Sequence, residues 1–147
     1  MKKVEFVIKR GSLAGKPGTT AYAIVRSLTY PVPGAAQMDV LSPSRELFFW
    51  YRRMANAGNW NKRAFYEEYV PRFLKEIKSN PAARAALEDL ARRSRDGETI
   101  ALACFCADES MCHRSIVVGI LAGAGADVRT DGNRDYSFYH DMYQDIA

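Results

Sequence analysis

The spacing of apolar residues along the chain predicts four strands. Residues 3–9 alternate apolar and charged positions and are rich in valine, isoleucine and phenylalanine, which is typical of a half-buried strand. Residues 21–28 predict a second strand, with Arg26 near its end. Residues 100–105 form the most continuously apolar run, as expected of a strand buried on both faces of a sheet. Residues 126–130 predict a short final strand.

Apolar residues recur at helical spacing between the second and third of these strands. After an extended, proline-rich loop, Ser42 as N-cap and Pro43 as first helical residue predict a helix that continues to about Ala55. The next helix is predicted over residues 62–77, where Pro71 should kink the helix or divide it one residue earlier.

Asn80 as N-cap and Pro81 as first helical residue predict a third helix. A helical crossover of this length between two strands of one sheet implies parallel strands and a right-handed connection. Another helix is predicted from about Cys112 to Gly123, and the aromatic, acidic tail is either a last helix or an ordered flap. Together these elements predict an α/β protein: a single domain over residues 1–147, without a separate linker, in which helices flank a mostly parallel, Rossmann-like sheet.

The composition favours a globular, cytoplasmic protein without a membrane partner. At 147 residues the chain has the size of one domain, with 48% hydrophobic and 26% charged residues. Its apolar runs are too short to span a bilayer, and the N-terminus lacks the apolar core of a secretory signal. The three cysteines fall within nine residues, where disulfides would close only tiny, strained loops, so we expect reduced thiols.

The net charge of +4 is unevenly distributed. Residues 45–95 hold twelve lysines and arginines against six aspartates and glutamates. This excess could attract a polyanion, but it is more typical of the solvated faces of amphipathic helices. The aromatic run Phe48, Phe49, Trp50 and Tyr51 in the same segment favours a place in the core over a platform on which bases stack.

The candidate chemistry is concentrated in one strand-turn-helix segment. Cys104 and Cys106 alternate onto the same side of the strand, and the turn returns Cys112 and His113 toward the end of that strand. In one hypothesis Cys112 is a nucleophile, because the positive end of the helix dipole favours its thiolate. Arg114 would then hold a phosphate or carboxylate through paired hydrogen bonds.

Two other interpretations of this segment stay open. Cys104, Cys106, Cys112 and His113 could supply four ligands of the kind that bind zinc, or the cysteines could be purely structural. The spacing does not match the common zinc knuckles, and the adjacency of Cys112 and His113 makes joint ligation awkward, so we expect no metal. The Cys-x5-Arg loop of cysteine phosphatases is also absent, which argues against phosphatase chemistry but not against anion binding.

The run from Cys104 to Ser115 resembles the corresponding segment of the bacterial domain of unknown function 488 family, in which a strand ending in cysteine is followed by a short turn, Cys-His-Arg and a helix. At the position of Cys106, members of that family commonly carry an acidic residue. Other features of the family recur in order along the chain: Ile8-Lys9-Arg10, Arg26, Leu41 to Ser44, and the spacing of Trp60, Phe65 and Tyr69. The resemblance implies one α/β domain, no established reaction, and a site built from Arg26, Cys104, Cys112, His113 and Arg114.

The leading hypothesis is a crevice at the carboxyl ends of the strands that carry Arg26 and Cys104, where open α/β sheets bind their ligands. It would bind an anionic small molecule such as a nucleotide or another phosphate-bearing compound. If the protein is an enzyme, Cys112 would be the nucleophile, His113 the acid and base, and Arg26 with Arg114 the anion clamps.

Two alternatives to this hypothesis come from other classes of function. One is a module that binds nucleic acid or a protein through the basic helical segment, residues 45–95. The other is a domain stabilised by zinc. The sequence leaves the cofactor and the oligomeric state open.

Overall fold

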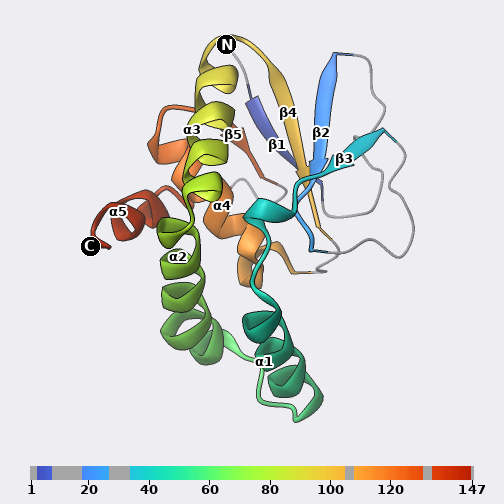
Figure 1. Cartoon of the computed structure of the whole chain (residues 1–147), viewed down its shortest axis with the longest axis vertical. Coiled ribbons are helices and arrows are strands. Elements are labelled where there is room, and N and C mark those ends of the chain that lie inside the picture. The colour runs from blue at the N-terminus through green and yellow to red at the C-terminus, as the bar shows by residue number, and fades with distance from the viewer. Residues whose placement is uncertain (1–2, 8–17, 27–33, 105–107, 131–133, 147) are drawn as a thin grey trace.

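Five strands form one parallel sheet in the computed structural model, which describes residues 3–7, 18–26, 34–104, 108–130 and 134–146 (Figure 1). The parallel pairing confirms the predicted α/β class. The second strand begins and ends earlier than the predicted residues 21–28. Across the sheet the order is β3 (Ala35–Gln37), β2 (Thr19–Ala23), β4 (Thr99–Ala103), β1 (Lys3–Val7) and β5 (Asp127–Arg129).

The two faces of the central strand β4 pack against cores of different size. Ile100 and Leu102 are fully buried in the large core that the helices share, whereas Ala101 and Ala103 lie in a small cluster of alanines on the other face. Side chains alternate along a strand, so Cys104, the residue after β4, falls on the same side as Ile100 and Leu102. The alternation therefore directs this cysteine toward the helices.

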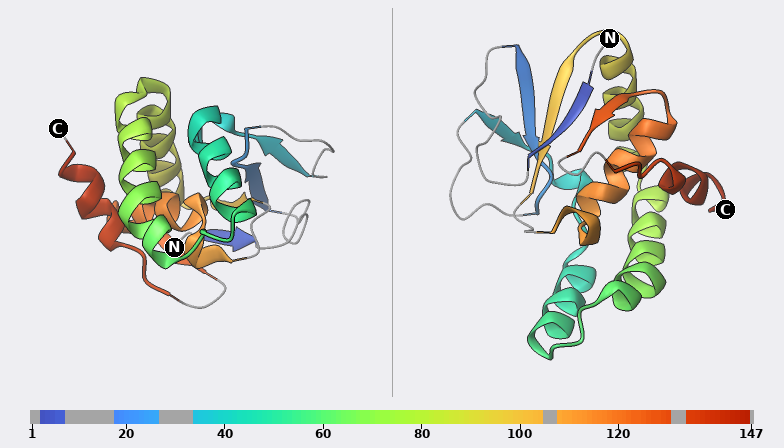
Figure 2. Two further views of the ribbon diagram at one scale, coloured as in Figure 1. Left: turned by 90° about the horizontal axis from the view of Figure 1, so that it is seen from below. Right: turned by 180° about the vertical axis from the view of Figure 1, so that it is seen from behind.

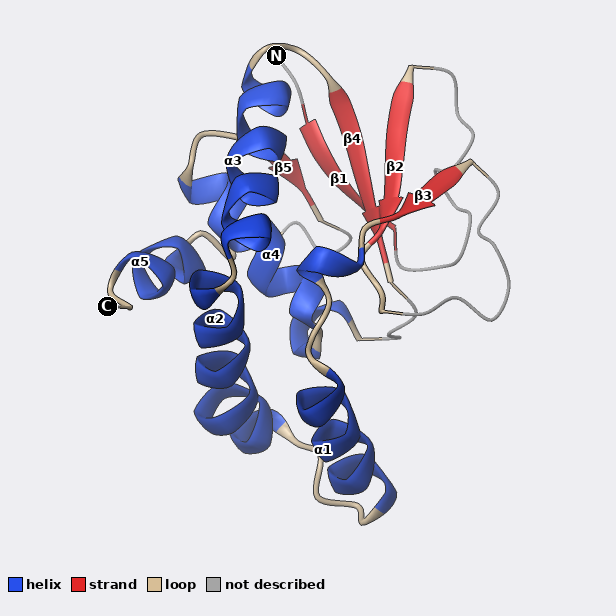
Figure 3. Ribbon diagram, viewed as in Figure 1, coloured by secondary structure: helices blue, strands red, loops and turns tan. Residues whose placement is uncertain are grey.

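Some of the helices lie against the sheet, and others extend beyond the carboxyl ends of its strands (Figures 1 and 3). The helices are α1 (Arg45–Asn56), α2 (Val70–Ser79), α3 (Pro81–Arg95), α4 (His113–Gly123) and α5 (Phe138–Gln144), with the 3-10 turns η1 (Asp39–Leu41) and η3 (Glu109–Met111) and the π-helical turn η2 (Ala64–Tyr69). Helix α1 stands beyond the carboxyl ends of the strands, as the view from behind in Figure 2 also shows. Within the described residues, no helix has the length and apolar character needed to span a membrane.

Helix α1 begins two residues later than predicted. Ser42 and Pro43 precede it, and Ser44 is the N-cap, whose Oγ accepts a hydrogen bond from a backbone amide of the first turn. The backbone amide and hydroxyl of Ser44 also donate to the carboxylate of Glu76 on α2, and the carbonyl of Pro43 accepts a hydrogen bond from Arg26 Nε at 2.9 Å. These long-range partners fix the boundary. The stretch before it, predicted as a loop, contains β3 and η1.

The expected effects of the two later prolines are confirmed. The helical segment predicted over residues 62–77 divides at Val70, one residue before Pro71. The amide of Val70 donates to the carbonyl of Phe65, five residues back, so the chain forms a wider turn just before the residue that lacks an N–H. Asn80 caps α3 through its side chain, and α3 begins at the proline that follows.

A paired ion bridge joins the end of α3 to the start of β4. Arg93 Nε donates to Glu98 Oε1 at 3.0 Å, and its Nη2 donates to the other carboxylate oxygen. The Arg93 guanidinium also lies over the ring of Tyr22 on β2, 5.4 Å from its centre. The hydrogen bond from Arg93 is the largest cause that lowers the pKa of the Glu98 carboxyl below its usual range.

Replacing Glu98 by glutamine is expected to lower the free energy of unfolding at pH 7 by about 1 kcal/mol, because a two-pronged pair exceeds the usual value of a surface ion pair. A lowered pKa means that the stabilisation is present above the ordinary carboxyl range and is lost as the pH falls below about 4. Urea unfolding at pH 7 and pH 3 measures this difference. The exposed Glu68→Gln variant is the control, and an equal loss for Glu98→Gln at both pH values would contradict the prediction.

Candidate functional site

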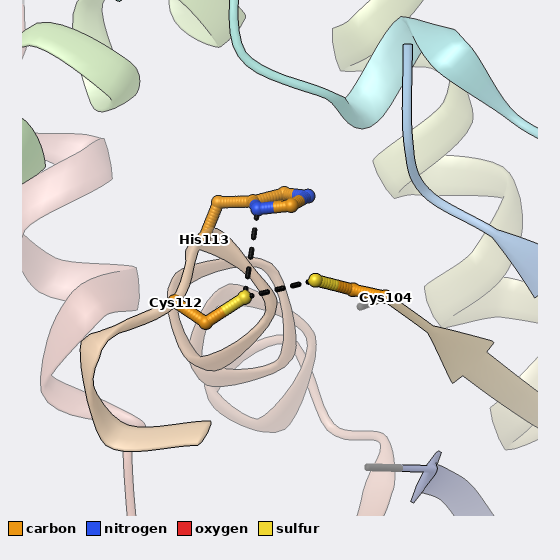
Figure 4. Close-up of side chains that lie close together, drawn as sticks. All are labelled: Cys104, Cys112 and His113. Atoms are coloured by element: carbon orange, nitrogen blue, oxygen red, sulfur yellow. Dashed lines mark hydrogen bonds between the residues drawn. The ribbon is translucent and has the colours of Figure 1, made fainter. Parts of the chain in front are cut away.

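Three side chains that the sequence singled out meet between β4 and α4 (Figure 4). Cys104 directly follows β4, Cys112 is the N-cap of α4, and His113 is the first residue of that helix. Cys104 Sγ lies 3.1 Å from Cys112 Sγ, and Cys112 Sγ lies 3.6 Å from His113 Nδ1. The predicted return of Cys112 and His113 to the end of this strand is therefore observed.

Local hydrogen bonds hold Cys112 in an extended conformation at the helix start. Its backbone has φ −131° and ψ 147°, and its carbonyl accepts hydrogen bonds from the amide and the hydroxyl of Ser115 at 3.0 and 2.8 Å. Ser115 is fully buried, so its hydroxyl satisfies its own hydrogen-bonding need within the first turn. The Cys112 side chain makes no capping bond to the helix and turns toward Cys104 and His113 instead.

The imidazole of His113 is oriented by a backbone carbonyl. His113 Nε2 lies 2.6 Å from the carbonyl oxygen of Ile24, the residue after β2. Because a carbonyl only accepts, Nε2 carries a hydrogen, and the neutral ring presents the lone pair of Nδ1 to Cys112. The ring of Phe73 packs against the imidazole with its centre 5.6 Å away. His113 Nδ1 is thus placed to accept a proton from the Cys112 thiol.

A cavity of about 700 Å³ opens onto this cluster, and we call it the site cavity. It lies between α1 and the carboxyl ends of β2 and β4, the region where open α/β sheets bind ligands. None of the described residues that line it is acidic. Its lining combines the cluster Cys104, Cys112 and His113 with three arginines, Arg26, Arg45 and Arg52, five aromatic residues, Phe48, Phe49, Tyr51, Trp60 and Tyr69, and three further side chains, Val25, Pro43 and Met111.

Trp60 is the centre of the aromatic wall. The rings of Tyr51 and Tyr69 meet it edge-on, with centres 4.7 and 5.6 Å away. The interpretation of the α1 aromatics as core holds for Trp50, which is half-buried against the core, whereas Tyr51 is half-buried against the core and also lines the cavity. This interpretation is wrong for the two phenylalanines of α1, which are 39% and 49% exposed and line the cavity. Tyr69 reaches the cavity from the end of the π-helical turn η2.

Arg26 lines the cavity as its place after a central strand suggested. Its Nε donates to Pro43, and its carbonyl accepts a hydrogen bond from the Gln37 side chain at 2.7 Å, so both ends of the residue are anchored. Arg45 and Arg52 add positive charge from α1, where they lie over the rings of its two exposed phenylalanines. Neither was predicted as a site residue, although their spacing of two helical turns places them on one face of α1.

Arg114 lies elsewhere. It is fully buried and is not among the residues that line the site cavity. The structure thus brings Arg26, Cys104, Cys112 and His113 to one cavity and leaves Arg114 in the interior. Cys106 lies outside the described residues. The anion-binding roles of the two predicted arginines stay predictions.

The same cluster has the donor types of a zinc site. The ligand atoms of Cys104, Cys112 and His113 all lie within 4.8 Å of one another, and all three side chains are buried. Tetrahedral zinc requires about 3.6 Å between sulfur and nitrogen and about 3.8 Å between sulfurs, so the two sulfurs would have to separate slightly. Joint ligation by the adjacent Cys112 and His113 was expected to be awkward, yet Cys112 Sγ and His113 Nδ1 already have the spacing that zinc requires. The metal alternative stays a prediction.

The chain is an α/β protein with a parallel sheet, and its Cys-His cluster lies at the carboxyl edge of that sheet. The chain matches the family model described as "DUF488-N3a: Active DUF488-N3 subclade" over residues 16–125, and it belongs to this family. The resemblance to the domain of unknown function 488 family is thereby confirmed, and the matched range includes Arg26, Cys104, Cys112 and His113. No curated protein and no solved structure matches the chain.

Proposed function

We propose that the site cavity binds an anionic small molecule that also carries an aromatic group, as a nucleotide does, and that Cys112 acts on it as a nucleophile. The observation that carries this proposal is the lining of the cavity. Arginines and aromatic rings line it, none of its described lining residues is acidic, and the cluster of Cys112 and His113 lies against it. An anion paired with arginines and a ring stacked on Trp60 would satisfy both parts of this surface.

The proposed chemistry uses the two contacts of the His113 ring, one with the Cys112 sulfur and one with the Ile24 carbonyl. His113 Nδ1 takes the proton from Cys112 Sγ, and the Ile24 carbonyl accepts a hydrogen bond from Nε2–H, which stabilises the resulting imidazolium. The amino end of α4 favours the thiolate, since Cys112 is its N-cap. The thiolate forms a bond to the electrophilic atom of the substrate, and the leaving group departs with the proton from Nδ1.

Tryptophan fluorescence tests the binding, because Trp60 lies in the cavity wall and Trp50 is the only other tryptophan of the chain. With Trp50 replaced by phenylalanine, nucleoside monophosphates are expected to change the Trp60 emission in a saturable way. Arg52→Ala should weaken that binding about tenfold, the usual loss when one charged hydrogen bond is removed.

The matched control is the neighbouring Arg53→Ala variant, because Arg53 is exposed and does not line the cavity. Its nucleotide affinity should stay within about twofold of the parent, since a surface charge outside the site contributes little. Equal losses for Arg52→Ala and Arg53→Ala, with tighter and strongly salt-dependent binding of an oligonucleotide, would support the alternative that residues 45–95 bind nucleic acid. No saturable response to any nucleotide would refute the proposal.

A further inference from the structure

We propose that Cys104 is a second reacting thiol, so that Cys104 and Cys112 form a dithiol–disulfide centre whose substrate is the disulfide of a small anionic thiol. The inference rests on the proposed nucleophilic role of Cys112 but not on nucleotide binding. Cys112 would attack the substrate disulfide, and Cys104 would then release the bound half of the substrate by attacking Cys112.

The placement of the two sulfurs supports this division of roles. They are 3.1 Å apart, against about 2.05 Å in a disulfide bond, so a shift of about 1 Å joins them. They come from two different elements, the end of β4 and the start of α4, and both line the site cavity. A substrate held on Cys112 would therefore lie within direct reach of Cys104.

The neighbouring imidazole makes the pair asymmetric. His113 Nδ1 is 3.6 Å from Cys112 Sγ, and Cys112 also occupies the amino end of α4, whereas Cys104 lies at the carboxyl end of a strand. Both features favour thiolate at Cys112. Cys112 is therefore the attacking sulfur, and Cys104 is the sulfur that resolves the adduct.

The two steps balance without a further reactant. The Cys112 thiolate attacks one sulfur of R–S–S–R′, a new sulfur–sulfur bond forms, and R′S⁻ leaves with the proton that His113 Nδ1 had taken. The Cys104 thiol then loses its proton through the imidazole and attacks Cys112 Sγ, which releases RSH. Two protein thiols become one disulfide, and the two electrons and two protons pass to the substrate as two thiols.

The position of Cys104 is also the reason for choosing a disulfide as substrate. Cys104 Sγ lies 3.1 Å from the Cys112 sulfur itself, and that sulfur is the electrophilic atom in a mixed disulfide, whereas an acyl or phosphoryl adduct is attacked at the attached carbon or phosphorus atom. Attack at the sulfur itself is the step that a neighbouring thiol performs. The arginines that line the site cavity, Arg26, Arg45 and Arg52, fit a substrate thiol with carboxylate or phosphate groups.

The test uses the full chain in a Cys106→Ser background, so that Cys104 and Cys112 are the only thiols. The reduced protein is treated with 5,5′-dithiobis(2-nitrobenzoate), an anionic aromatic disulfide. We expect two equivalents of released thionitrobenzoate, no retained adduct, and a mass lower by two hydrogen atoms. The added Cys104→Ser change should release one equivalent and retain one on Cys112, and Cys112→Ser should react at least about tenfold more slowly.

Several results would overturn the inference. An adduct retained on the protein that has both cysteines would show that Cys104 does not resolve it, while Cys112 would remain a nucleophile. Reaction only after a chelator is added would show that the two sulfurs hold a metal ion. Absence of reaction at Cys112 in every variant would refute the nucleophile itself. Circular dichroism confirms folding of each variant, and Cys104→Ala repeats the measurement with a smaller side chain.

Discussion

Replacing Gly119 by alanine is expected to lower the free energy of unfolding by about 3 kcal/mol and to loosen α5 from α4. A Cβ atom at this position would lie 2.0 Å from the carbonyl oxygen of Tyr136 and 2.9 Å from a ring carbon of Tyr139. The first contact is with backbone, which cannot rotate away, so the segment that leads into α5 must shift. Overpacking of this kind typically costs about 1–3 kcal/mol, and a backbone clash belongs at the upper end.

The sign of this change is informative because helix propensity predicts the opposite. Alanine in a helix interior is favoured over glycine by roughly 0.5–1 kcal/mol, so a purely local effect would stabilise α4. Urea unfolding measures the stability, and limited proteolysis of residues 134–146 reports whether α5 has loosened. Far-ultraviolet circular dichroism should show that most of the helix content is retained. A gain in stability with an equally protected tail would show that α5 does not pack against Gly119.

Much of the fold could be predicted because the signals for its elements are local. The alternating and continuous apolar runs located β1, β4 and β5, and Pro71 and Asn80 marked helix boundaries through the loss of an N–H and the gain of a cap. The start of α1 could not be predicted in the same way. Ser42 and Ser44 both precede the apolar stripe, and the choice of Ser44 depends on Glu76 more than thirty residues later.

The candidate site also contains residues whose placement could be predicted from local sequence and residues whose placement could not. Cys104, Cys112 and His113 could be brought together from strand alternation and a short turn, since these are local constraints. Arg114 follows His113 in sequence but lies in the interior, because successive residues of a helix point in directions about 100° apart. The helix phase relative to the sheet depends on packing among several elements, which no single motif encodes.

The far wall of the cavity could not be predicted from motifs at all. Trp60 and Tyr69 reach it from the connection after α1 and from the π-helical turn before Pro71, and no local pattern in these segments places them at the cavity. Aromatic residues at helical spacing are usually core, and the sequence offers no local sign that Phe48 and Phe49 line a cavity instead. The arginines of this wall appeared in the sequence only as part of the excess of basic residues over residues 45–95.

Replacing His113 by alanine is expected to slow the alkylation of Cys112 by iodoacetamide at pH 7 by about tenfold. An ordinary thiol is only a few per cent thiolate at this pH, so a partner that takes the proton can raise the reactive fraction by up to about 30-fold. His113 Nδ1 faces Cys112 Sγ at 3.6 Å, and the Ile24 carbonyl holds the ring in that orientation. The rate is measured with Cys104 and Cys106 replaced by serine, so that one thiol remains.

Comparison of two pH values separates proton transfer from simple access to the thiol. Near pH 10 almost every thiol is ionised without help, so the rates of the parent and of His113→Ala should converge there. The matched control is His140→Ala, which removes the only other histidine, on α5 and outside the cavity lining. It should leave the rate at pH 7 unchanged. A loss for His113→Ala that persists undiminished at pH 10 would mean that the imidazole only shapes the cavity, and that Cys112 is not activated by its neighbour.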